Sequence, residues 1–187
     1  MNEDNVIIRP AQKGDSELIA KVVAMAIGTD DGSALYPVFL ELAGREVAQY
    51  SYRNALVAEV GGRAAGAIVG YDGARLHELR EPIYELLQKH LGKTIEIEEE
   101  TADGEFYLDS LAVLPEFRGL GVGRLLLSAM IERAFSEGHE RAGLLVDFDN
   151  PRAEKLYASL GFERVDRTTF LGHDMWHLQI CRAMQIN

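Results

Sequence analysis

One glycine-rich turn constrains this chain more than any other feature. The run RGLGVGR at 118–124 follows a strand-like stretch, 105–113, and opens a strongly apolar helical stretch, 121–136. Alternate glycines at such a turn let backbone N–H groups converge at the positive end of a helix, and flanking arginines add charge. The turn therefore predicts a phosphate site. The alternative, a tight turn without a ligand, needs the same glycines and stays open at this point.

Two familiar nucleotide-binding loops do not fit the turn. A Walker loop ends in Gly-Lys-Ser/Thr, and the turn at 118–124 has no such ending. A dinucleotide fingerprint that starts at Gly119 needs a glycine where Arg124 stands. Both alternatives therefore fail on spacing.

A second patterned segment follows at 150–162. Asn150 precedes Pro151, which predicts the N-cap and first position of a helix, and Gly161 predicts its end. The apolar face of this helix would hold Ala153, Leu156, Tyr157 and Leu160.

The two segments together resemble the GNAT N-acetyltransferase superfamily. The run at 118–123 is similar to its Arg/Gln-x-x-Gly-x-Gly/Ala signature, and the Leu-Ala-Val at 111–113 is typical of the preceding strand. The run from Asn150 to Phe162 looks like its Asn-x-x-Ala-x-x-x-Tyr-x-x-x-Gly-Phe block. The resemblance covers about residues 105–163, and neither 72–104 nor the acceptor site has a counterpart in it.

The resemblance implies acetyl-CoA as co-substrate and no metal. The pyrophosphate would sit on the amides of 118–123, and the pantetheine arm would pair with the backbone of Leu111 and Val113 like an added strand. In the family that strand carries a bulge and splays from its neighbour, and an amide there faces the thioester oxygen. The implied cofactor-binding residues are Leu111, Ala112, Val113, Arg118, Gly119, Leu120, Gly121, Val122, Gly123, Arg124 and Asn150.

Two residues are catalytic candidates. Tyr157 matches the position of a general acid that protonates the departing thiolate, whereas helical spacing alone favours a core aromatic. Asp109 is the candidate base, or alternatively a charge that attracts an ammonium group. Strand alternation would place its side chain on one face with Tyr107 and Leu111. Glu105, with a longer reach, and water are alternative bases.

The pattern of elements predicts an α/β fold with a mixed, mostly antiparallel seven-stranded sheet, helices on both faces and splayed central strands. Residues 1–187 would form a single GNAT-like domain, with an insertion at about 72–104 packed on one edge. A second helical stretch is expected within 36–52, broken near Gly44. Strands are expected near 6–10, 55–60, 63–71, 105–113, 144–147, 162–170 and 175–184.

Composition excludes several functional classes. A net charge of −11 opposes binding to nucleic acids and to anionic membranes. The sequence has no apolar run as long as a membrane span, and its N-terminus does not resemble a signal peptide. A single cysteine, Cys181, fits a reducing compartment. We therefore expect a cytoplasmic protein.

Two polar features have ordinary explanations. His173 and His177 share four-residue spacing but fall in a predicted strand without a third ligand nearby, so structural histidines are favoured over zinc ligands. The acidic run 96–100 is typical of a solvated surface; a role in attracting a cationic substrate is the alternative.

These observations predict an acetyl-CoA-dependent N-acetyltransferase in which a primary amine of a small molecule attacks the thioester directly. No cysteine lies near the motif strand to carry an acyl intermediate. Two other functions stay open: acetylation of an N-terminal or peptide amine, and a non-catalytic acyl-CoA-binding sensor. The acceptor, the length of the acyl group and the oligomeric state, for which a homodimer is common in the family, stay open as well.

Overall fold

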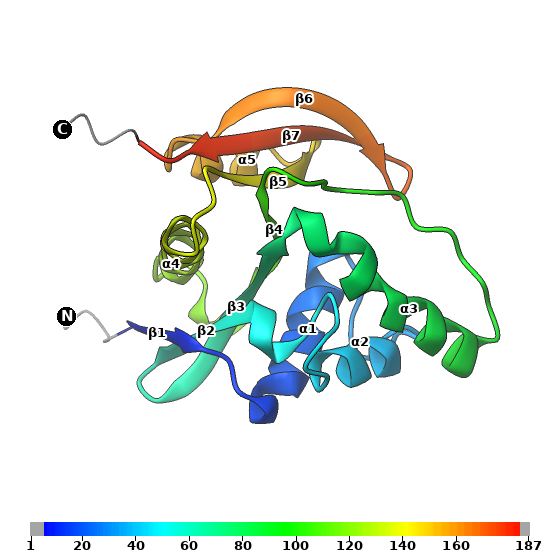
Figure 1. Cartoon of the computed structure of the whole chain (residues 1–187). Helices are drawn as coiled ribbons and strands as arrows, with labels where there is room; N and C mark the ends of the chain where they lie inside the picture. The colour runs from blue at the N-terminus through cyan, green and yellow to red at the C-terminus, as the bar shows by residue number, and fades with distance from the viewer. Residues whose placement is uncertain (1–5, 184–187) are drawn as a thin grey trace.

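The computed structural model describes residues 6–183, and within that range seven strands form one mixed sheet in the order β1-β2-β3-β4-β5-β7-β6 (Figure 1). The strands are β1 (Val6–Pro10), β2 (Ala55–Val60), β3 (Arg63–Asp72), β4 (Phe106–Val113), β5 (Arg141–Asp147), β6 (Glu163–Phe170) and β7 (His173–Cys181). Neighbouring strands are antiparallel except β4 and β5. The predicted fold class is confirmed. Met184, the expected end of the last strand, lies outside the described residues.

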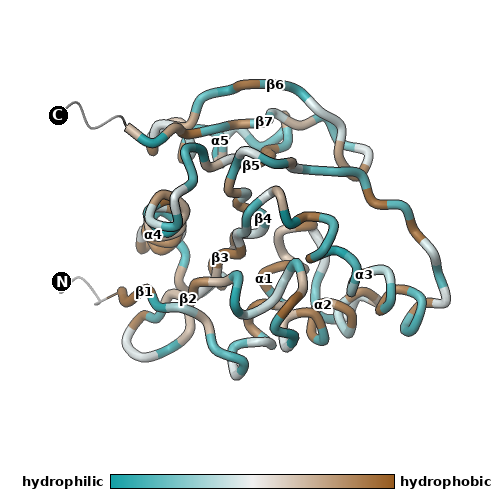
Figure 2. The backbone as a smooth tube through the Cα atoms, viewed as in Figure 1, coloured by the Kyte–Doolittle hydropathy of each residue, from teal (hydrophilic) through white to brown (hydrophobic). Residues whose placement is uncertain are grey.

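Helices cover both faces of the sheet, as predicted. They are α1 (Ser16–Ala26), α2 (Tyr36–Ala43), α3 (Leu76–Leu91), α4 (Val122–Ser136) and α5 (Pro151–Ala158). One core cluster joins α4 to the sheet through residues such as Phe106 and Leu126, and another joins α1 to it through Ile19 and Tyr107. Hydrophobic and hydrophilic stretches alternate along α4 (Figure 2), as expected of a helix that buries one face.

The sheet splits between its two central parallel strands. In the described range, β4 pairs with β5 only at Phe106–Ala142 and Tyr107–Gly143, although β4 runs on to Val113 and β5 to Asp147. The edge of β4 beyond Tyr107 is therefore not hydrogen-bonded to β5, as the predicted splaying of the central strands requires.

A bulge in β4 corrects one expectation. The register against β3 slips between the pairs Val69–Ser110 and Gly70–Leu108, which leaves Asp109 as the extra residue. Strict alternation fails at a bulge. Tyr107 packs in the α1-side core, whereas Leu111 packs against the α4-side core. The prediction that Tyr107, Asp109 and Leu111 share one face is therefore wrong.

The chain after Gly44 also differs from expectation. Helix α2 ends at Ala43, and the α-helical conformation does not resume before Tyr52. Instead the backbone N–H of Gln49 donates to the carbonyl oxygen of Leu79 on α3, at 2.7 Å. This contact ties the 44–51 segment to the region between β3 and β4.

That region, 72–104, consists of α3 and a long extended stretch that crosses toward the hairpin of β6 and β7 before it enters β4 (Figure 1). Its apolar side chains pack against α2 and the α1-side core. The extended stretch passes close to the backbone of Gly73, and only glycine leaves room for it, because a Cβ at this position would overlap the carbonyl group of Ala102. The stretch is thus fitted closely to the sheet.

Candidate active site

The glycine-rich turn presents its backbone at the N-terminus of α4. Gly119 and Gly121 have φ angles of 81° and 77°, in the left-handed region that favours glycine. A Cβ at either position would meet no described atom within 4 Å. The turn therefore faces open space with the positive end of a four-turn helix behind it, which is the geometry of an anion site.

The two flanking arginines secure the turn to its surroundings. Arg118 donates from Nε to the carbonyl oxygen of Val113, at 3.2 Å. Arg124 donates to the hydroxyl and carbonyl oxygens of Ser159 at the end of α5, at 2.7 and 3.3 Å. These bonds fix the turn between the end of β4 and α5. Asn150 caps α5 as predicted, since its side-chain oxygen accepts from the N–H of Ala153 at 3.1 Å.

A small cavity of about 30 Å³ lies where β4 and β5 separate. Its lining brings together Asp109, Leu111 and Tyr157, three residues that the sequence placed in the site. Tyr157 packs edge-on against Phe162, with ring centroids 6.0 Å apart. Burial raises the pKa of Tyr157 above its ordinary value, so the phenol stays protonated at neutral pH. The hydroxyl therefore carries a proton that it can donate.

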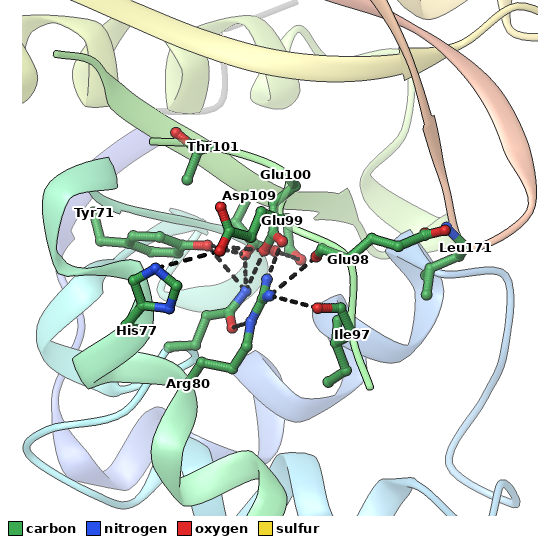
Figure 3. A network of polar contacts seen from close by, with 12 residues as sticks. Tyr71, His77, Arg80, Ile97, Glu98, Glu99, Glu100, Thr101, Asp109 and Leu171 are labelled. Atoms are coloured by element: carbon green, nitrogen blue, oxygen red, sulfur yellow. Dashed lines mark hydrogen bonds and ion pairs between the residues drawn. The ribbon is translucent and has the colours of Figure 1, made fainter. Parts of the chain in front are cut away.

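Asp109 is held in a buried polar network (Figure 3). Its Oδ2 accepts from Gln49 Nε2 and from the Tyr71 hydroxyl, each at 2.8 Å, and its Oδ1 accepts from the Ser110 hydroxyl at 2.7 Å. These three hydrogen bonds fix the position of the Asp109 carboxylate at the wall of the smaller cavity.

The 72–104 region contributes an ion pair to the same network. Arg80 on α3 donates to the Glu100 carboxylate and to the carbonyl oxygens of Ile97 and Glu98 (Figure 3). The side chains of Arg80 and Glu100 are only 4% and 3% exposed. Burial and then the nearby Asp109 charge raise the pKa of Glu100 above its ordinary value, against the effect of Arg80. Glu100 Oε1 also accepts from Gln49 at 2.7 Å.

Sequence reasoning missed most of this network. Glu100 belongs to an acidic run that is typical of a solvated surface, and no residue of the set Gln49, Tyr71 and Arg80 is among the predicted site residues. One signal was available for Arg80, because it falls on the apolar stripe of α3 with Leu76, Ile83 and Leu87. A charged residue in such a stripe is a candidate for a buried ion pair.

A second, larger cavity of about 370 Å³ lies beside the first. Leu145 on β5 lines both. The larger cavity is bounded by the stretch 99–105 and by β5, β6 and β7, and its lining includes Glu105 and His177. Its size is that of a small-molecule site. Among the described residues, no group of His, Cys, Asp or Glu side chains is arranged to hold a metal ion.

Comparison with known proteins is consistent with this geometry. The model of the acetyltransferase (GNAT) family matches residues 25–162. A mycothiol acetyltransferase of Kocuria rhizophila is 40% identical over 77 residues, which are 41% of this chain and 21% of that protein. The chain thus matches about a fifth of that relative's length. Within residues 6–183, no helix has the length and hydropathy of a membrane span.

Solved structures extend the likeness over nearly the whole chain. A structure described as an acetyltransferase is 36% identical, covers 94% of this chain and 98% of its own, and superposes with a TM-score of 0.78. The structure of yncA from Salmonella typhimurium with its cofactor acetyl-CoA is 20% identical, covers 97% of this chain and 96% of its own, and has a TM-score of 0.65. This second likeness concerns the fold.

Proposed function

Because the chain belongs to the GNAT family of acetyltransferases, we propose that it transfers the acetyl group of acetyl-CoA directly to a primary amine of a small molecule. One observation carries the proposal: the split between β4 and β5 ends in a cavity where Tyr157 and Asp109 meet. A neighbouring cavity of about 370 Å³ offers room for an acceptor. Donor and acceptor would then meet at the boundary that Leu145 forms.

The donor would enter the split along β4. Its pyrophosphate would bind the amides of 118–123, and its pantetheine arm would bond to the edge of Leu111–Val113, which β5 leaves unpaired. An amide in that stretch would donate to the thioester oxygen as negative charge develops. The known acetyl-CoA complex of a protein with this fold supports the choice of donor.

The acceptor amine would arrive as an ammonium ion. Asp109, half-buried beside Glu100 and Tyr71, would supply negative charge where a cation must be drawn toward the thioester. After loss of a proton, the amine attacks the carbonyl carbon, the C–S bond breaks, and Tyr157 protonates the thiolate. Cys181 is exposed and lines neither cavity, which is in keeping with transfer without an acyl-enzyme.

The proposal is tested with purified protein in two steps. Calorimetry with acetyl-CoA and with CoA measures donor binding, and CoA release is then followed across a panel of small primary amines and N-terminal peptides. We expect donor binding and turnover with at least one small amine. Turnover with peptides alone would transfer the assignment to a peptide acetyltransferase. Donor binding without turnover would indicate a sensor, and the absence of donor binding would refute all three.

A charge placed in the glycine-rich turn tests the pyrophosphate site. Aspartate tolerates the left-handed conformation and is a good N-cap, so Gly121→Asp should fold. Its carboxylate would occupy the anion position and repel pyrophosphate. We expect the affinity for CoA to fall at least tenfold, about 1.4 kcal/mol, as measured by calorimetry.

Gly62→Asp is the matched control. Gly62 has a φ of 76°, and a Cβ there also meets no described atom within 4 Å, but it lies in the turn between β2 and β3. The control adds the same charge to the same backbone conformation and should leave CoA affinity unchanged. A folded Gly121→Asp variant that binds CoA within threefold of the parent would exclude this turn as the site.

A further inference from the structure

We propose that His177, oriented by Glu105, is the general base that removes a proton from the acceptor ammonium group. This inference rests on the proposed amine acetylation. His177 lines the larger cavity on β7, and its Nε2 lies 2.9 Å from Glu105 Oε2. The two residues are separated by 72 positions, and no local pattern connects them.

Three donors hold the Glu105 carboxylate in place. Thr101 and Gln179 each donate to it at 2.7 Å, and His177 is the third partner. Burial alone would raise the pKa of Glu105, but the hydrogen bonds outweigh it and lower the pKa below its ordinary value. Glu105 is therefore ionised at neutral pH and acts only as an acceptor.

The charge on Glu105 fixes the tautomer of the imidazole. Because a carboxylate accepts hydrogen bonds, the proton of neutral His177 lies on Nε2 and the lone pair on Nδ1. The His177 side chain is 21% exposed, against 5% for Glu105, so the imidazole is the member of the pair that a ligand in the cavity can reach.

A glycine makes the pair possible across an intervening strand. Gly143 lies on β5, between β4 and β7. A Cβ at Gly143 would overlap the Glu105 carboxylate and would lie 3.1 Å from His177 Nε2. The carboxylate therefore reaches the histidine through the space that the missing side chain leaves.

Strand register places His177 at the level of the reaction. Tyr107 pairs with Gly143 in parallel register, and Asp109 and Leu145, each two residues further on, both line the smaller cavity. Leu145 in turn pairs with His177. His177 thus lies two strands from the bulge in β4, about 10 Å at ordinary strand spacing before the splay is added, a span that an acceptor and a water molecule can bridge.

The proton balance closes without any further reactant. The ammonium gives one proton to His177 Nδ1, directly or through water, and the imidazolium is stabilised by Glu105. The neutral amine attacks the thioester, the C–S bond breaks and the thiolate takes the Tyr157 proton. The second nitrogen proton leaves to water as the amide forms. Tyr157 regains a proton from water and His177 releases its own, so one proton is released per turnover.

Several other charged groups border the same cavity and enter the pH dependence. They are Glu99, Glu100 and Asp103 from the stretch before β4, Arg141 on β5, and Asp166 and Arg167 on β6. Asp166 stands opposite His177 in the register of β6 and β7. Removal of Glu105 leaves this background unchanged, so a shift on its removal reports on the pair itself.

The test measures kcat/KM for an active amine against pH at saturating acetyl-CoA. We expect kcat/KM of the parent to rise with pH as the base loses its proton, which gives the pH profile a rising limb. His177→Gln should remove that limb and lower kcat about 10²-fold, with CoA affinity unchanged. Glu105→Gln, which is isosteric, should move the limb to lower pH, because the imidazolium loses its anionic partner.

His173→Gln is the matched control. His173 also lies on β7 and also pairs with a carboxylate, Asp147 Oδ2 at 2.9 Å, but it is 65% exposed and lines neither cavity. Its pH profile should match that of the parent. A parent that shows no turnover with any amine contradicts the proposed function. An active parent whose pH limb survives in His177→Gln, or stays in place in Glu105→Gln, overturns the inference about His177 alone.

Discussion

Tyr157→Phe should lower turnover by roughly 10² while acetyl-CoA binding changes little. The phenol would donate its proton only as the C–S bond breaks, so its hydroxyl stabilises the transition state more than the ground state. The phenylalanine ring keeps the edge-on packing against Phe162. Steady-state kinetics should therefore show a lower kcat and an unchanged donor KM.

Tyr84→Phe provides the control for this substitution. Tyr84 is a partly buried tyrosine on α3 that lines neither cavity. Its variant should keep the parent kcat. If Tyr157→Phe also retains turnover within threefold of the parent, the hydroxyl has no part in the reaction. Tyr157 is then a core aromatic, and water or another residue protonates the thiolate.

Arg80→Met should destabilise the fold by about 3–5 kcal/mol, because it leaves Glu100 buried without its cation. Methionine keeps most of the aliphatic volume of the side chain, so the loss reports mainly on the charge. The backbone carbonyls of Ile97 and Glu98 also lose their donor. Chemical denaturation at neutral pH measures the change in the free energy of unfolding.

The loss in Arg80→Met should depend on pH in a definite direction. The pKa of Glu100 is raised in the folded protein, and it rises further without Arg80. An acid with a raised folded pKa binds its proton more tightly in the native state, so stability falls as pH rises from the unfolded value, ~4.3, toward the folded one. The variant should therefore lose less stability at about pH 5 than at about pH 8.

An exposed ion pair at the start of α3 serves as the control for the buried pair. Arg75 and Glu78 lie 2.9 Å apart, but their side chains are 48% and 55% exposed. Arg75→Met should change the free energy of unfolding by no more than about 0.5 kcal/mol. Equal losses in Arg75→Met and Arg80→Met would mean that the buried pair does not hold the 72–104 region in place.

The parts of the molecule that the sequence predicted well are those with local signals. The glycine-rich turn needs left-handed backbone at Gly119 and Gly121. The side chain of Asn150 accepts a hydrogen bond from the backbone N–H of Ala153, only three residues away. Turns and helix caps depend on residues close together in the chain, so a single sequence is enough to predict them. The order of helices and strands along the chain followed from the same local patterns, and it predicted a mixed seven-stranded sheet.

The parts that it missed depend on contacts between distant segments. The resemblance implied a bulge in β4, but its position at Asp109 depends on the register of β4 against β3, which no pattern within β4 encodes. Gln49, Tyr71, Glu100 and Asp109 converge from four separate segments. His177 looked like a structural residue until the fold placed it against Glu105. Residue types that usually lie on the surface form a connected polar network here, because the fold brings them together in its interior.

A crystal structure of the protein with bound CoA tests the account most directly. We expect the pyrophosphate on the amides of 118–123 and the pantetheine arm along the free edge of β4. The sulfur atom should lie within about 3.5 Å of the Tyr157 hydroxyl, in the cavity that Asp109 also lines. Pyrophosphate bound elsewhere, or a sulfur atom that points away from Tyr157 and from the split between β4 and β5, would contradict the proposed site and its mechanism.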